Sequence, residues 1–196
     1  MAIVNHERNE VSCKIVYFGA PGSGKTQNLR SVYRGSASQQ GHQSVIELAS
    51  PTTGNQYFEF LPVSLGRIED YHVKLHLFTE PSETFPSVRD VVLQGLDGCV
   101  FIVDSQFDRI QENLECIEKS KAHLKHLGYD LDQIPCIYQY NKRDCESAVE
   151  VSILSHDLNS QKSPEFSAIA TEDKGTLETV HRMAQLILEG LGQRVE

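Results

Sequence analysis

The sequence GAPGSGKT at residues 19–26 limits the possible folds of this chain more than any other feature. It matches the phosphate-binding pattern G-x-x-x-x-G-K-S/T without a gap. The apolar stretch VSCKIVYFG leads into it and a stretch with helical character follows, which is the context that the pattern requires. Glycines let the backbone come close to phosphate groups, and the free amides at the start of a helix attract anions. We therefore predict a strand, a nucleotide-binding loop and a helix in this order.

Each residue type in this loop has an expected task. We expect the backbone amides to surround the phosphates, Lys25 to pair with the β- and γ-phosphates and assist catalysis, and the Thr26 hydroxyl to bind Mg²⁺. The nucleotide-binding residues predicted here are Gly19, Gly22, Ser23, Gly24, Lys25, Thr26 and Gln27. A glycine-rich turn without function is the alternative, and the strand-loop-helix context disfavours it.

A second motif, NKRD, follows another apolar stretch and points to the base of the nucleotide. The carboxylate of Asp144 can accept two hydrogen bonds from guanine N1–H and the 2-amino group, whereas adenine offers neither donor there. Lys142 can lie over the plane of the base, and Asn141 can tie this loop to the phosphate loop. The motif is weak alone but strong after a phosphate loop, so it favours GTP over ATP. A further backbone contact with the guanine oxygen is expected after the last strand, at Ala170 and Thr171.

The hydrophobic pattern alternates between strand and helix periods along the whole chain. Strands are predicted at residues 11–19, 45–48, 56–65, 71–78, 98–105, 134–140 and 166–170. Helices are predicted at residues 25–35, 84–95, 108–127, 149–157 and 175–190, and 66–70 is a hairpin turn. This order predicts an α/β fold with helices on both faces of a mostly parallel sheet of six or seven strands and one antiparallel edge hairpin.

Length and composition fit one domain. We predict an N-terminal extension at 1–10, a single nucleotide-binding domain at 11–191 and a short tail at 192–196. The net charge of −9 provides no basic face for phosphates of DNA or RNA, so no nucleic-acid partner is expected. No apolar run approaches the roughly 20 residues of a membrane helix, so no integral membrane segment is expected. The polar N-terminus lacks the apolar region of a signal peptide, which favours a cytoplasmic location.

Asp104, at the end of an apolar strand, has two interpretations. It can be an acidic residue of the Walker B type, which acts near the metal ion. Alternatively, Asp104 and Ser105 start and cap the following helix, and this second interpretation is the favoured one.

Five strings occur along the chain in the order that a known family shows. They are CKIVYFGAPGSGKTQNL, FEFLPVSLG, LHLFTEPSE, GCVFIVDS and IYQYNKRD. Together, over about residues 11–190, they resemble the MglA-type bacterial Ras-like GTPases, which regulate cell polarity and gliding motility.

This resemblance implies a Ras-like fold and a cytoplasmic switch that cycles between GTP and GDP with Mg²⁺. It also implies recruitment to a cell pole in the GTP form. A roadblock/longin-type partner dimer is expected to activate GTP hydrolysis, and the expected effectors belong to motility or polarity systems.

The chain departs from the family at switch II. The family pattern is T-x-P-G-Q, but this chain reads TEPSE, so Ser82 replaces the glycine and Glu83 the catalytic glutamine. A serine at this position can hinder the approach of the backbone amide to the γ-phosphate. An ionised glutamate only accepts hydrogen bonds and brings a negative charge to an anionic phosphate, and Glu80 adds another. Glu83 is therefore a doubtful catalytic residue.

The chain also departs from the family at switch I, where residues of the family pattern are replaced. Counted back from FEFLP, the intrinsic arginine of the family falls on Gly54 and the next threonine on Asn55. Thr53, or Thr52 beside it, can still offer a hydroxyl to Mg²⁺.

Two main hypotheses follow from these patterns. The first is a switch GTPase whose slow hydrolysis is completed by a partner. The second is a pseudo-GTPase that binds GTP and GDP without meaningful turnover and uses the nucleotide to hold an interaction surface. A kinase that uses ATP is a third, weaker option, because the chain has no lid with paired arginines.

Overall fold

A computed structural model describes residues 2–36, 44–49, 56–81 and 86–192 of the chain. Its centre is an eight-stranded sheet with the strand order β3-β4-β5-β2-β6-β7-β8, and β1 pairs with β2 outside this path. The strands are β1 (Ile3–Asn5), β2 (Glu10–Phe18), β3 (Ile46–Ala49), β4 (Gln56–Ile68), β5 (Tyr71–Thr79), β6 (Gly98–Asp104), β7 (Cys136–Asn141) and β8 (Glu165–Ser167).

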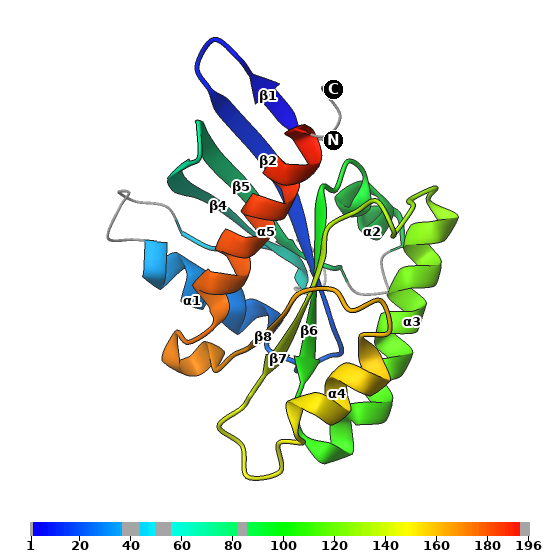
Figure 1. Ribbon diagram of the computed structural model, residues 1–196. Helices are drawn as coiled ribbons and strands as arrows, with labels where there is room; N and C mark the ends of the chain where they lie inside the picture. The colour runs from blue at the N-terminus through cyan, green and yellow to red at the C-terminus, as the bar shows by residue number, and fades with distance from the viewer. Residues whose placement is uncertain (1, 37–43, 50–55, 82–85, 193–196) are drawn as a thin grey trace.

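Helices cover both faces of this sheet (Figure 1). They are α1 (Lys25–Ser36), α2 (Pro86–Leu93), α3 (Ile110–His126), α4 (Val151–Leu158) and α5 (Thr176–Gly192), with short 3-10 helices η1 (Phe107–Arg109) and η2 (Ala170–Glu172). Helices α1 and α5 lie on one face, and α2, α3 and α4 lie on the other. No helix in the described part of the chain is long and apolar enough to cross a membrane.

Each face of the sheet has its own hydrophobic core. Successive side chains of a strand point to opposite faces, so Ile15 and Tyr17 of β2 pack toward α1 and α5 while Val16 and Phe18 pack toward α2 and α3. Strand β6 is buried at every residue because helices lie on both sides of it. The α/β fold with two helical layers, predicted from the sequence, is confirmed.

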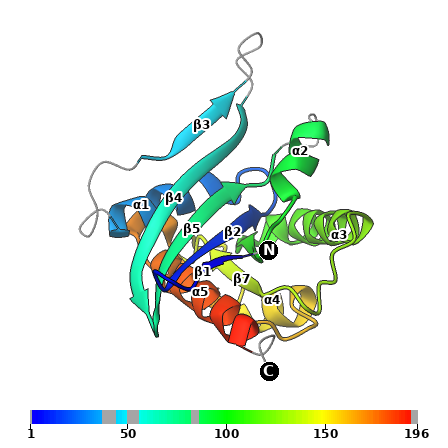
Figure 2. The same cartoon turned by 90° about the horizontal axis from the view of Figure 1, so that it is seen from above.

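The direction of the strands brings the motif-bearing loops together. Strand β2 runs parallel to β5 and β6, and β6, β7 and β8 are parallel to one another. Strands β3, β4 and β5 form an antiparallel edge, which curves away from the rest of the sheet in Figure 2. Parallel strands end at the same edge, so the loops after β2, β6 and β7 meet there.

The structure corrects the prediction at the N-terminus. No strand was expected before residue 11, but Ile3–Asn5 form β1, which pairs antiparallel with the beginning of β2. This pairing is possible because β6 joins β2 only from Ile15 onward. Strand β1 has only three residues, and its apolar run is too short to distinguish a strand from an extended terminus by its period. Within the described residues the sheet therefore has eight strands instead of six or seven.

Some predicted boundaries also move. Strand β4 continues to Ile68, so the turn expected at 66–70 contains only Glu69 and Asp70. The last strand, expected at 166–170, is Glu165–Ser167, and Ala170 begins η2. The remaining elements agree with the predictions, with their ends shifted by a few residues.

Candidate nucleotide-binding site

The phosphate loop connects β2 to α1, and its conformation at residue 24 suits only glycine. Gly24 has a φ of +103°, and a Cβ atom there would lie 2.3 Å from Nδ2 of Asn141. Gly22 has a φ of +77°, and a Cβ atom there would meet nothing within 4 Å. The loop therefore packs tightly against the NKRD loop on one side and is open on the other, where a phosphate group can approach.

Lys25 lies over this loop at the start of α1. Its ammonium donates hydrogen bonds to the carbonyl oxygens of Gly19, at 2.6 Å, and Ala20, at 3.2 Å. Burial lowers the pKa of Lys25, and nearby acidic groups, including Glu80 and Glu59, partly oppose this shift. The partners of the ammonium are neutral carbonyl groups, so an anionic phosphate at this position would be a stronger partner.

The hydroxyl of Thr26 donates a hydrogen bond to Oε1 of Glu59, at 2.5 Å. Glu59 comes from β4, its side chain is buried, and its backbone amide donates to the hydroxyl of Thr79 at the end of β5. A hydroxyl and a carboxylate are oxygen ligands of the kind that Mg²⁺ prefers. Sequence reasoning missed Glu59, although it lies on the same buried face of β4 as Leu61 and Val63, where an acidic residue is unusual.

Asn141 joins three loops at the edge of the sheet. Its side-chain Nδ2 donates to the backbone carbonyl of Ser23 at 2.9 Å. Its Oδ1 accepts from the backbone amide of Ala170 at 3.1 Å. Gln27 also reaches the third loop, because its Nε2 donates to the carbonyl of Ala170 at 3.4 Å. The predicted link between the NKRD loop and the phosphate loop is therefore present, and the amide of Ala170 contributes to it.

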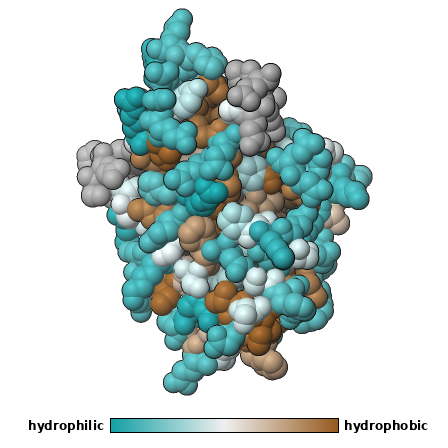
Figure 3. Space-filling view, viewed as in Figure 1, coloured by the Kyte–Doolittle hydropathy of each residue, from teal (hydrophilic) through white to brown (hydrophobic). Residues whose placement is uncertain are grey.

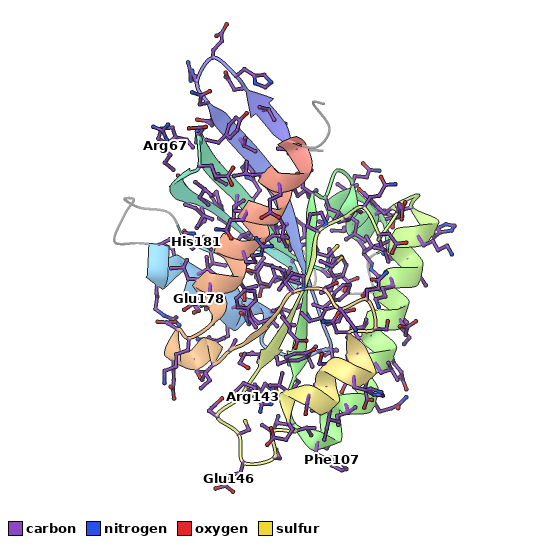
Figure 4. The ribbon with its side chains drawn as sticks, viewed as in Figure 1. Arg67, Phe107, Arg143, Glu146, Glu178 and His181 are labelled. Atoms are coloured by element: carbon purple, nitrogen blue, oxygen red, sulfur yellow. The ribbon has the colours of Figure 1, made fainter. Side chains whose placement is uncertain are left out.

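Arg143 of the NKRD loop is labelled in the lower half of the molecule in Figure 4, above Glu146. Lys142 has a left-handed backbone with a φ of +60°, and its ammonium lies 2.6 Å from Oδ2 of Asp104. The amide of Arg143 donates to the carbonyl of Ala168, which holds the loop against the next one. Asp144 is exposed, as is Thr171, so both are accessible to a base.

The favoured interpretation of Asp104 is wrong. The N-cap residues of η1 and α3 are Gln106 and Arg109, and neither makes a side-chain capping bond. The hydroxyl of Ser105 has no hydrogen-bond partner among the described residues. Asp104 instead accepts from the Gln106 amide at 3.2 Å and pairs with Lys142, so its carboxylate lies beside the NKRD loop.

The switch residues of the sequence prediction, Thr53, Gly54, Ser82 and Glu83, lie outside the described residues. Glu80, next to them, does not act as a free negative charge. It forms a buried ion pair with Arg89 of α2, with an Nη2–Oε1 distance of 2.5 Å, and accepts from the Ser120 hydroxyl of α3. Burial raises the pKa of Glu80, and the charge of Arg89 opposes this shift.

The fold and the site together define a class of protein. A Ras-like α/β sheet collects a GxxxxGKT loop and an NKxD loop at one edge, and a buried asparagine joins them. This combination is that of a small GTPase, a P-loop protein that binds guanine nucleotides.

Comparison with known proteins identifies the family. No protein-family model matches the chain. The chain is 38 % identical over 192 residues to Mutual gliding-motility protein MglA of Myxococcus xanthus (strain DK1622), an alignment that covers 97 % of this chain and 98 % of that protein. The chain therefore belongs to the MglA-type small GTPases, as the resemblance of its motifs predicted, and it is a GTP-binding switch.

Proposed function

We propose that this chain is a GTP-dependent switch that regulates cell polarity or gliding motility, with Mg²⁺ as the metal ion of the bound nucleotide. The bond between Asn141 and Ser23 carries the binding part of this proposal, because it joins the GAPGSGKT loop to the NKRD loop at one edge of the sheet, where one nucleotide could contact both. The motility part rests on the similarity to the Myxococcus xanthus protein.

The residues at the phosphate end fit a Mg²⁺–nucleotide complex. The Lys25 ammonium can exchange the carbonyls of Gly19 and Ala20 for phosphate oxygens. Thr26 and Glu59 would hold Mg²⁺, with Thr53 as a further candidate from the sequence. When bound, the ion neutralises charge on the β- and γ-phosphates. At the other end, Asp144 would accept hydrogen bonds from guanine, with Lys142 over the base and Thr171 near the guanine oxygen.

Calorimetric titration with GDP, GTP and ATP in the presence of Mg²⁺ tests this proposal. GTP and GDP should bind far more tightly than ATP. The variant Asp144→Asn should lose affinity for GDP and gain affinity for xanthosine diphosphate, because an amide in place of the carboxylate suits a base with a carbonyl at position 2. Equal affinities for ATP and GTP in the parent protein would contradict the proposal.

For hydrolysis, we propose a slow intrinsic rate that depends on a partner. Glu83 stands where the family has a catalytic glutamine, Ser82 replaces a glycine, and Gly54 replaces an arginine. Ras-type hydrolysis without an arginine finger proceeds at roughly 10⁻⁴ per second, and we expect this protein to be no faster. The alternative is a pseudo-GTPase without meaningful turnover. The rate of GTP hydrolysis, measured with and without a partner, distinguishes it from a slow GTPase.

Single-turnover hydrolysis of preloaded GTP provides that measurement. The parent protein should barely turn over alone, and the double variant Ser82→Gly with Glu83→Gln should be faster. Fast hydrolysis by the parent would overturn the slow-rate proposal. A parent that stays inactive with every activating partner tested would favour the pseudo-GTPase.

We also propose that a roadblock/longin-type partner dimer contacts residues 56–95, which cover β4, β5 and α2. Exposed apolar side chains next to or within this region support the choice: Ile46 and Leu48 on β3, and Val91 on α2, which is 65 % exposed. Hydrogen exchange with and without the partner should show protection there. Protection confined to α3 would contradict this surface.

For location, we propose the cytoplasm, with recruitment to a cell pole in the GTP form. A fluorescent fusion should concentrate at a pole, and the Lys25→Ala variant, which cannot hold the phosphates, should remain diffuse. Equal polar concentration of both would contradict a nucleotide-dependent location.

A further inference from the structure

An ion pair between Lys142 of the NKRD loop and a buried carboxylate supports this loop from behind. Oδ2 of Asp104, at the end of β6, lies 2.6 Å from the ammonium of Lys142. The side chain of Asp104 is 1 % exposed, whereas that of Lys142 is 31 % exposed. Strands β6 and β7 are paired here, with Asp104 opposite Asn141. The carboxylate therefore lies directly behind the NKRD loop and attracts the lysine from the interior.

The carboxylate has a fixed position that does not depend on Lys142. The backbone amide of Gln106 and the side-chain Nε2 of Gln106 both donate to Oδ1 of Asp104, each at 3.2 Å. On the backbone, Asn113 of α3 donates to the carbonyl of Asp104 and accepts from its amide. Asp104 is thus held by β6, by the following turn and by α3.

Asp104 also lies close to a cation that reaches the phosphate loop. Nε of Arg109 is 3.7 Å from Oδ2 of Asp104, and its Nη2 donates to the carbonyl of Pro21 at 2.7 Å. Pro21 belongs to GAPGSGKT. One buried carboxylate is therefore flanked by two cations: Lys142 of the NKRD loop, and Arg109 of η1, whose side chain reaches the phosphate loop.

A lysine that must lie over a base loses the rotamer freedom of its long side chain, which opposes binding. A fixed counter-ion reduces this cost, because it holds the side chain near its bound position before the nucleotide arrives. Asp104 has the position, burial and charge to do this. We propose that Asp104 is a positioning residue that holds Lys142 for stacking on guanine, and that Arg109 connects this support to the phosphate loop. The proposal rests on guanine-nucleotide binding at the NKRD loop.

The experiment measures the release of a fluorescent GDP analogue from the full chain. Asp104→Asn keeps the shape and the acceptor for Gln106 but removes the charge. It should release the analogue about tenfold to a hundredfold faster, the range expected for a lost charge-assisted hydrogen bond. Lys142→Ala should have a similar effect. The double variant should be no faster than Lys142→Ala alone, because Asp104 acts through that lysine.

Two further measurements separate positioning from general loss of structure. The preference for GDP over inosine diphosphate, which lacks the 2-amino group, should stay at the parent value in Asp104→Asn, because Asp144 is intact. A loss of this preference, or additive effects in the double variant, would overturn the proposal. Tyr129→Phe is the control: it removes a partly buried 2.6 Å hydrogen bond to the carbonyl of Leu93, away from the site, and should leave release unchanged.

The failure of the proposal and the failure of nucleotide binding give different results. A parent protein that does not bind GDP would overturn guanine-nucleotide binding itself. A parent that binds GDP tightly, together with an Asp104→Asn variant that releases it at the parent rate, would overturn only the role of Asp104.

Discussion

The side-chain amide of Asn141 bonds to the backbone carbonyl of Ser23 on one side and to the backbone amide of Ala170 on the other. Asn141 is 3 % exposed, and the Ser23 side chain is fully buried. The phosphate loop, the NKRD loop and the loop after β8 are thereby one connected unit. A nucleotide that binds across them meets a surface that is already assembled, which reduces the entropy cost of binding.

Asn141→Ala should break this unit. Both hydrogen bonds disappear, and the carbonyl of Ser23 and the amide of Ala170 lose their partner. Each loss costs about 1–3 kcal/mol in a buried site, so the affinity for GDP should fall at least tenfold. Asn141→Asp keeps an acceptor for Ala170 but places a carboxylate oxygen against the carbonyl of Ser23, so calorimetry should find an affinity no higher than that of Asn141→Ala. An unchanged affinity in Asn141→Ala would show that the loops hold together without it.

Gly24→Ala should damage the same contact from the other side. A Cβ atom at Gly24 would lie 2.3 Å from Nδ2 of Asn141, and the φ of +103° is already unfavourable for alanine. Gly22→Ala is the matched control, because its φ of +77° carries similar backbone strain but its Cβ atom meets nothing within 4 Å. Backbone strain alone costs about 1–2 kcal/mol. In urea unfolding, Gly24→Ala should therefore lose more stability than Gly22→Ala, and equal losses would contradict the steric argument.

Arg89→Ala should destabilise the fold through Glu80. The two side chains form a buried ion pair, with exposed fractions of 11 % and 9 %, and the variant leaves the Glu80 carboxylate without its cation. Removing one partner of a buried pair costs about 3–5 kcal/mol. Adding Glu80→Gln removes the uncompensated charge, so the double variant should recover part of this loss in urea unfolding. A double variant as unstable as Arg89→Ala would show that the loss comes from packing of the arginine stem.

His76 should make the stability of the antiparallel edge depend on pH. Burial lowers the pKa of His76, with help from Lys74 and Lys14, and its ring stacks on Phe60 at 5.9 Å between centroids. Because the folded pKa is below the unfolded value of about 6.5, the unfolded chain binds more protons as the pH falls through this window. The contribution of His76 is therefore present above that unfolded value and is lost as the pH falls through the folded one.

The variant His76→Phe isolates this effect, because phenylalanine keeps a ring on Phe60 but cannot titrate. Urea unfolding at a series of pH values from about 8 to about 5 should show the parent losing free energy of unfolding relative to the variant. Parallel curves for the two proteins would rule out His76 as the source.

In the view of Figure 3, hydrophilic residues cover most of the surface and hydrophobic residues appear in scattered patches between them. The two nucleotide-binding motifs were recognisable because each is a continuous string, and its chemistry depends on neighbours along the chain. GAPGSGKT needs glycines and a lysine at fixed spacing, and NKRD needs its three fixed residues after a strand. The alternation of strands and helices was predictable for the same reason, since each period is local.

Contacts between residues far apart in the sequence were decided only by the tertiary structure. Glu59 meets Thr26 because β4 folds back along the sheet, and Asp104 meets Lys142 because β6 and β7 pair in a particular register. Strand β1 exists because β6 leaves the first part of β2 uncovered. A local pattern carries no information on such pairs: each side chain has the same sequence neighbours whichever partner it meets. The sequence by itself determined the two motifs and the class of fold, whereas strand pairing and register decided which carboxylates support them.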